Sequence, residues 1–294
     1  MYAVVSSGAR VYDVLCPTDY MIEKMINQGL LYEYDIKELS NYENIDERIL
    51  KIIKSFDKNN SYVVPYVHST LGMIYNKTEL DRKNLPYPKK WGDLWNEQYK
   101  DEILMQDAMR DLLMVGLKKN NFSLNTTNQL ELDIATEDLI KQKPLVNAYM
   151  IDDLRDKMVG ASGTIAVMYS GEVEYIKEEG KPFQYEYILP EEGVNFTIDA
   201  WVIPHNAKNI DLAKKWIDFM LDPVIALKNF DEMHYGIANL KTIEMLKERD
   251  GEEIIHNEAI FPNLDEIDKY ELYKDLGSFE ENYNEAFKRI KGTK

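Results

Sequence analysis

The sequence predicts an α/β protein. Short strand-like runs alternate with amphipathic helical segments along the 294 residues, a pattern typical of α/β folds rather than of helical bundles or β-sandwiches. Hydrophobic residues make up 45% of the chain, which is enough for more than one core. The sequence shows no internal repeat and no low-complexity linker. We therefore expect lobes connected by several strand crossings rather than domains joined by a linker.

The opening segment is the clearest βα unit. Residues 11–16 (VYDVLC) read as a mostly buried strand, and Thr18 or Asp19 can cap a following helix that Gly29 stops. A short polar loop at the carboxyl end of a strand is where open α/β sheets place their ligands. Thr18, Asp19 and Tyr20 are therefore the first candidates for a binding site.

Further strands follow along the chain. Residues 61–76 are rich in β-branched and aromatic residues, and Pro65 and Gly72 interrupt them. We expect two strands joined through an extended crossing there. Shorter strands are expected within residues 159–170, 183–190 and 194–204.

Two helical segments carry the remaining signal. Residues 101–117 run into a helix on which Asp107 and Asp111, four positions apart, would share one face. Residues 209–229 read as an amphipathic helix that Pro223 kinks or restarts. The apolar face of this second helix is expected to comprise Leu212, Ala213, Trp216, Ile217 and Met220.

The chain is strongly acidic. Lys and Arg number 35 against 52 Asp and Glu, which gives a formal net charge of −17. Because nucleic acids and anionic membrane surfaces attract Lys and Arg, this balance argues against both as partners. No run approaches the length of a membrane span, and no export signal is visible. The single cysteine, Cys16, is expected to be a buried structural thiol.

Enzyme motifs are missing from the sequence. It contains no GxSxG elbow, no phosphate loop, no GxGxxG and no HExxH. The four histidines are scattered, so a zinc site is not expected and each is assigned to the surface or a loop: His68, His205, His234 and His256. Asp107 and Asp111 leave one distant alternative open, an acid-pair hydrolase.

Aromatic and acidic residues occur together instead. The chain has 20 tyrosines, and several stand beside carboxylates at the ends of expected strands. Aromatic faces attract an ammonium group, and carboxylates neutralise it with charge-assisted hydrogen bonds. The residue types therefore suit an organic cation, although single tyrosines of this kind are also common in cores.

Several blocks, in order, resemble the spermidine/putrescine-binding proteins of polyamine ABC transporters. These blocks are YDVLCPTDYMIEKMINQGLLYEYD, PYVHSTLGMIYN, WGDLW, YSGE, DAWVIPHNAKN, WIDFMLDP and DLGSFEENYNEAFKRIK. The resemblance implies a two-lobed periplasmic-binding-protein fold, the Venus flytrap, that closes on a polyamine. It implies a binding component that delivers its ligand to a permease outside the cytoplasm. No catalysis and no cofactor are expected.

The resemblance also implies lobe boundaries and site residues. Lobe one would comprise residues 1–67 and 200–255, and lobe two residues 68–199 and 256–294, with crossings near 65–70 and 197–201. The positions that match the family's ligand-binding residues are Thr18, Tyr20, Asp107, Asp111, Tyr169, Asp199, Tyr235 and Tyr273. Asp199 would hold an inner amine, Asp107 and Asp111 would face an amine, and Tyr169 would stack on the methylene chain.

The sequence departs from the family at two aromatic positions. Thr197 replaces an aromatic residue, and His68-Ser69 stands where Trp-Gly is usual. Losing an aromatic wall costs about 0.5 to 2 kcal/mol of cation attraction. A solute-binding protein of this fold for thiamine or ferric iron therefore stays open as an alternative.

The resemblance also implies that the family's first β-α-β unit is missing ahead of Tyr2. Family members carry, ahead of the position of Tyr2, a signal peptide and then this unit, of about 30 or more residues, with an aromatic motif that lines the site. We therefore expect lobe one to be incomplete and completed by a homodimer, swapping or rearrangement. A chain that binds no ligand is a further alternative.

Overall fold

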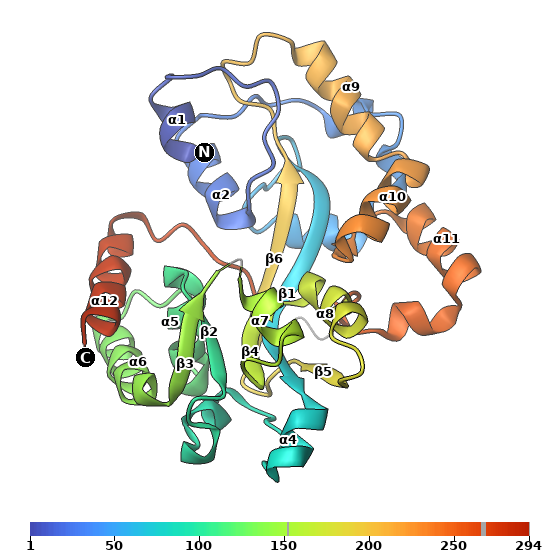
Figure 1. Cartoon of the computed structure of the whole chain (residues 1–294). Coiled ribbons are helices and arrows are strands. Elements are labelled where there is room, and N and C mark those ends of the chain that lie inside the picture. The colour runs from blue at the N-terminus through green and yellow to red at the C-terminus, as the bar shows by residue number, and fades with distance from the viewer. Residues whose placement is uncertain (152, 266–268, 294) are drawn as a thin grey trace. The chain divides into compact units, whose positions relative to one another are not determined.

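The structure, a computed structural model, describes residues 1–151, 153–265 and 269–293. It divides into two compact units (Figure 1). Unit 1 consists of Met1–Ser69, Thr197–Leu264 and Leu272–Asp275, and unit 2 of Thr70–Phe196, Asp265–Glu271 and Leu276–Lys294. These units place residues 256–264 and 272–275 in unit 1, whereas the boundaries expected from the sequence assign both segments to lobe two.

The strands form one hydrogen-bonded series in the order β3-β2-β4-β1-β6-β8, with β5 and β7 each paired to β1. Their bounds are β1 Val64–Asn76, β2 Ile103–Gln106, β3 Val146–Met150, β4 Ile165–Tyr169, β5 Tyr185–Ile188, β6 Val194–Trp201, β7 Gly236–Ile237 and β8 Tyr270–Glu271. Neighbours β2 and β3 run parallel, and so do β2 and β4, whereas β1 and β4 run antiparallel. Strands alternating with helices confirm the predicted α/β class.

Strand β1 is a single strand of 13 residues, so the prediction of two strands within residues 61–76 is wrong. Pro65 lies at its second position, where the missing N–H is tolerated. Gly72 does not break the strand either, because its lack of a side chain permits a close approach. A Cβ atom at this position would lie 2.6 Å from the backbone oxygen of Ile188 in β5.

Residues 11–16 do not form the predicted buried strand. Val11 and Tyr12 are 43% and 36% exposed. This part of the chain forms isolated bridges with β6 and the residue after it, Leu15 with Val202 and Thr18 with Asp199. Pro17, between the two bridges, has no N–H to donate to the pairing. The segment therefore runs beside the end of β6 without becoming a strand.

The helices divide between the two units. Unit 1 contains α1 Tyr2–Ser6, α2 Asp19–Asn27, α3 Glu47–Ile53, α9 Ile210–Met220, α10 Pro223–Met233 and α11 Leu240–Asp250. Unit 2 contains α4 Lys77–Lys83, α5 Met109–Lys119, α6 Gln129–Gln142, α7 Leu154–Val159, α8 Val173–Glu179 and α12 Glu280–Gly292. The predicted helix after Thr18 is confirmed as α2, with Ile22 and Met25 fully buried.

Helices α9 and α10 confirm the restart predicted at Pro223, which is the first residue of α10. The carboxylate of Asp222 caps α10 by accepting the amides of Val224 and Ile225. The predicted apolar face of α9 is wrong in part. Ala213, Ile217 and Met220 are buried, whereas Leu212 and Trp216 are 65% and 46% exposed, because the sequence gives two apolar stripes and the core covers one.

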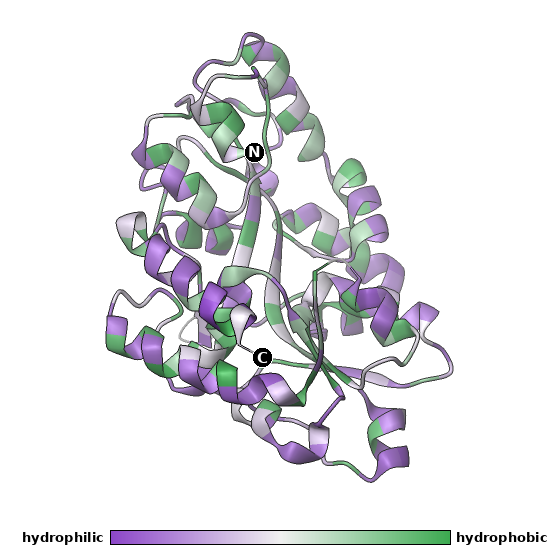
Figure 2. Cartoon of the chain, turned by 60° about the vertical axis from the view of Figure 1, so that its left-hand side comes forward, coloured by the Kyte–Doolittle hydropathy of each residue, from purple (hydrophilic) through white to green (hydrophobic). Residues whose placement is uncertain are grey.

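Each unit buries a core of its own. One cluster in unit 1 gathers residues from the first 64 positions together with Ile203 in the loop after β6 and Ala213, Ile217 and Leu221 from α9 and its end. In unit 2 the indole of Trp91 is fully buried, and its N–H donates to the backbone oxygen of Gly193 at 2.9 Å. Figure 2 shows hydrophobic and hydrophilic residues mixed on the helices, as expected where one face packs on a core.

Candidate ligand-binding site

The Thr18 loop lies against β6 in unit 1. The backbones of Thr18 and Asp199 form an antiparallel bridge. Asp19, the first residue of α2, is fully buried, and its carboxylate accepts the amides of Tyr20 at 2.7 Å and Ile198 at 3.3 Å. The buried carboxylate therefore fixes the two predicted site residues that flank it, Thr18 and Tyr20, to the strand that carries Asp199.

Asp199 is a half-buried carboxylate. Burial raises its pKa to about 6. Nearby Cys16 is half-buried rather than fully buried, and burial together with the charge of Asp199 raises the pKa of its thiol to about 12. Since desolvation disfavours the ionised carboxylate, a cation beside Asp199 would recover part of that lost solvation.

Tyr273 packs against Tyr20 in the same unit. Their ring centroids are 6.0 Å apart and nearly perpendicular, an edge-to-face arrangement, and Tyr273 is 4% exposed. Two residues later, the amide of Asp275 donates to Glu23 of α2 at 2.6 Å. The structure thus brings Thr18, Tyr20, Asp199 and Tyr273 together around the start of α2.

Tyr235 lies in another part of unit 1. It packs against a hydrophobic cluster of Val67, Phe230, Ile237, Leu246 and Ile260. The predicted role of Tyr235 as a wall of the ligand site stays a prediction.

Two predicted residues meet in unit 2. Asp111 lies in the first turn of α5 and is 6% exposed, and Tyr169 is the last residue of β4. The hydroxyl of Tyr169 donates to Oδ1 of Asp111 at 2.9 Å. This bond fixes the direction of the Tyr169 ring and gives the buried carboxylate a partner.

Asp107 does not share a helix face with Asp111, contrary to the prediction. Asp107 follows β2 and precedes α5, which begins only at Met109. Its carboxylate accepts from Lys291 Nζ at 2.6 Å. A spacing of four positions is typical of one helix face, but Asp107 belongs to the loop before α5.

A cavity of about 620 Å³ lies in unit 1. Among the described residues, its lining includes His68, Glu244, Lys247 and Phe261 and none of the predicted site residues. His68 is not a surface or loop residue as predicted, because it is a buried residue of β1, 4% exposed. Burial lowers its pKa to about 4, so the ring is neutral at pH 7.

The described parts of the chain hold no group of three or more His, Cys, Asp or Glu side chains placed to bind a metal ion. Within the same residues, no helix has the length and apolar character needed to cross a membrane.

Two carboxylates of this region are not among the positions that match the family's ligand-binding residues: Glu271, which accepts from Lys118, Ser123, Leu124 and Asn125, and Asp19 at the start of α2. The signal for Asp19 was a carboxylate at the first position of a helix, directly between two site candidates. Glu271 carries no such signal, because its partners lie about 150 positions away in the sequence.

Known proteins are similar to this chain in sequence and in fold. The profile of a family described as bacterial extracellular solute-binding protein matches residues 10–232. A spermidine/putrescine-binding periplasmic protein of Salmonella typhimurium is 30% identical over 280 residues, which cover 95% of this chain and 77% of that protein. A putrescine/cadaverine-binding protein of Pseudomonas aeruginosa is 30% identical over 286 residues, covering 95% and 79%.

The fold comparison agrees. The crystal structure of a spermidine/putrescine ABC transporter substrate-binding protein of Streptococcus pneumoniae superposes with a TM-score of 0.85 at 32% identity. The match covers all of this chain and 87% of that one. The predicted periplasmic-binding-protein fold is thereby confirmed. The chain belongs to the bacterial extracellular solute-binding proteins.

Proposed function

We propose that this protein is the substrate-binding component of a polyamine ABC transporter, which binds spermidine or putrescine outside the cytoplasm and delivers it to a permease. The observation that carries the proposal is the half-buried carboxylate of Asp199. Burial raises its pKa to about 6, and its backbone forms a bridge with Thr18. The names of relatives at 30% identity over 95% of this chain support a polyamine as the ligand.

Unit 1 offers an ammonium group a carboxylate beside aromatic rings. The Asp199 carboxylate would accept charge-assisted hydrogen bonds, which are about twice as strong as neutral ones. Tyr20 and Tyr273 would offer ring surface to the cation or to its methylene chain. Tyr235 is proposed as a further wall for the ligand in unit 1.

Unit 2 would bind a second amine with Asp111 and Tyr169. The hydroxyl of Tyr169 donates to one oxygen of Asp111. Each carboxylate oxygen accepts more than one hydrogen bond, so an ammonium group would bind to the same carboxylate beside the tyrosine hydroxyl. Asp107 would contribute less, because its charge is already balanced by Lys291.

The proposed binding role requires no chemical reaction at Asp107 or Asp111. Asp107 and Asp111 do not form a pair on one helix face, and each has a partner of its own. A binding role therefore accounts for both carboxylates without the acid-pair hydrolase. Thiamine and ferric iron rank below polyamines because the relatives' names favour polyamines.

Calorimetric titration with spermidine, putrescine and the uncharged 1,4-butanediol tests the function. We expect heat with the two polyamines and none with the diol, since only the amines are cations. Asp199→Asn should weaken polyamine binding by about tenfold or more.

The matched control is Asp57→Asn, which neutralises a buried carboxylate of unit 1 that accepts the amides of Ser61, Tyr62 and Val63. It should lower stability but leave the dissociation constant unchanged. Equal binding of the diol, or heat with thiamine or ferric iron and none with polyamines, would contradict the proposal.

A further inference from the structure

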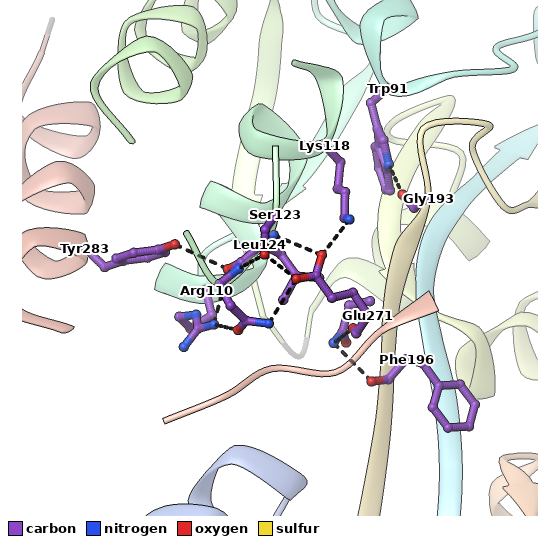
Figure 3. A network of polar contacts seen from close by, with 11 residues as sticks. Trp91, Arg110, Lys118, Ser123, Leu124, Gly193, Phe196, Glu271 and Tyr283 are labelled. Atoms are coloured by element: carbon purple, nitrogen blue, oxygen red, sulfur yellow. Dashed lines mark hydrogen bonds and ion pairs between the residues drawn. The ribbon is translucent and has the colours of Figure 1, made fainter. Parts of the chain in front are cut away.

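Glu271, the last residue of β8, is the centre of a polar network in unit 2 (Figure 3). Its Oε2 accepts from Lys118 Nζ at 2.7 Å and from the amide of Leu124 at 3.2 Å. Its Oε1 accepts from Asn125 Nδ2 at 3.1 Å and from the hydroxyl of Ser123. One carboxylate thus ties the chain at position 271 to α5 and to the loop that follows it.

The backbone at the same position is also held. Strand β8 pairs in parallel with β6, Tyr270 beside Val194 and Glu271 beside Asn195. The amide side chain of Asn195 donates to the backbone oxygen of Glu271 at 3.2 Å. Position 271 is therefore fixed through both its main chain and its side chain.

The fixed position leads directly into a predicted ligand-binding segment. Leu272–Asp275 has no regular secondary structure, yet Tyr273 within it is only 4% exposed and packs on Tyr20. At the far end of the segment, the amide of Asp275 donates to the carboxylate of Glu23. A carboxylate therefore anchors the segment on each side of Tyr273, Glu271 before it and Glu23 after it.

The Glu271 anchor is charged at neutral pH. Burial by itself would raise the pKa of Glu271, but hydrogen bonds from Lys118 and Ser123 and the charge of Lys118 lower it below its ordinary value. The Lys118 side chain is 12% exposed, so solvent screens this ion pair only partly. Hydrogen bonds to an ionised acceptor are stronger than neutral ones, which suits a positioning role.

We propose that Glu271 is a positioning residue for the polyamine site, one that sets where Tyr273 lies without touching the ligand. This inference rests on the proposed function. Two residues of extended chain span at most about 7 Å, so a shift of the anchor at 271 is passed to Tyr273 with little slack.

The variant that tests the inference is Glu271→Gln, which keeps the shape of the side chain and removes its charge. The matched control is Asp138→Asn. Asp138 is a partly buried carboxylate of unit 2 that accepts from Lys119 and Asn120. Both variants lose an ion pair, so a general loss of stability appears in both.

Two readouts separate positioning from stability. Hydrogen exchange of the Leu272–Asp275 amides should accelerate in Glu271→Gln and stay unchanged in Asp138→Asn, whether or not a polyamine binds. Calorimetry should show spermidine binding weakened by about three- to tenfold in Glu271→Gln. In a Tyr273→Ala background, Glu271→Gln should have no further effect on the affinity for spermidine, because the ring that Glu271 positions is absent.

The outcomes distinguish the two proposals. Unchanged exchange in Glu271→Gln, or a loss of affinity that adds fully to that of Tyr273→Ala, would overturn the positioning role. A different result would overturn the polyamine function and leave the positioning role in place. In that result, the Leu272–Asp275 amides exchange faster in Glu271→Gln than in wild type, but the wild-type protein gives no heat with spermidine or putrescine.

Discussion

The backbone of Thr18 pairs with that of Asp199 in an isolated antiparallel bridge. The bridge joins the start of α2 to the carboxylate with the raised pKa in β6. A helix start and a half-buried acid far apart in sequence are thus held together by main-chain hydrogen bonding, which side-chain substitutions at either position leave in place. Substitutions here therefore test the chemistry of the side chains rather than the path of the chain.

The raised pKa of Asp199 predicts that polyamine binding depends on pH. The amines stay protonated between pH 7.5 and 5, whereas Asp199, with a pKa of about 6, becomes mostly protonated at the lower pH. We expect the affinity for spermidine to fall by about tenfold over this range. Calorimetry at several pH values checks this, and Asp199→Asn should flatten the profile. A wild-type affinity that is constant from pH 7.5 to 5 would contradict the role of Asp199.

The same group predicts an opposite trend for the stability of the free protein. Because the folded pKa of Asp199 lies above the unfolded value, this residue favours the folded state at low pH. That contribution is lost as the pH rises from about 4 through 6. Urea unfolding of wild type and Asp199→Asn should show the asparagine variant gaining stability relative to wild type across this range. A constant difference would show that Asp199 does not titrate there.

Asp19→Asn should destabilise the protein by about 1 to 3 kcal/mol. Asp19 is fully buried and accepts the amides of Tyr20 and Ile198, and an asparagine offers one acceptor oxygen in place of two. Urea unfolding measures the change in the free energy of unfolding. Asp35→Asn serves as the control, since Asp35 accepts one amide, that of Lys37, at an exposed turn. Equal effects of the two substitutions would show that burial of Asp19 has no special cost.

The elements that sequence reasoning found are those whose signal is local. Helix α2 follows from apolar periodicity and a stop glycine, and the restart at α10 from Pro223. The predicted strand at residues 11–16 is wrong because β-propensity does not show whether a partner strand continues beside them. The predicted shared helix face of Asp107 and Asp111 is wrong because a spacing of four does not reveal where a helix begins.

Among the site residues, too, the sequence predicts those that have a local signal and not those whose partners are distant in sequence. Thr18 and Tyr20 are separated by one residue, so the sequence alone predicts that they lie in the same loop. The partners of Glu271 could not, because Lys118 lies 153 positions away and no residue pattern links the two. His68 was assigned to the surface on the general rule for histidines, whereas its place in the middle of β1 buries it.

Gly72→Ala should destabilise the protein by about 2 kcal/mol or more. The new Cβ would lie 2.6 Å from the backbone oxygen of Ile188 and equally close to the hydroxyl of Tyr187. That hydroxyl donates to the backbone oxygen of Thr70, so moving it breaks this hydrogen bond, and moving Ile188 disturbs the pairing of β1 with β5. Thermal unfolding measures the loss, and Gly92→Ala, where a Cβ meets only the end of the Lys90 side chain at 3.9 Å, is the control.

Lys291→Met tests whether Asp107 faces an amine. Nζ of Lys291 lies 2.6 Å from Oδ1 of Asp107 and balances its charge. Removing this ammonium group leaves the Asp107 carboxylate without its ion-pair partner. If Asp107 is a ligand-binding residue, spermidine should bind about twofold or more tightly to this variant. Lys288→Met, which loses an exposed ion pair with Glu285 on the same helix, should leave the affinity unchanged. If the two variants bind spermidine equally, Asp107 serves only to hold α12 to the end of β2, and Asp111 with Tyr169 accounts for the amine contact of unit 2.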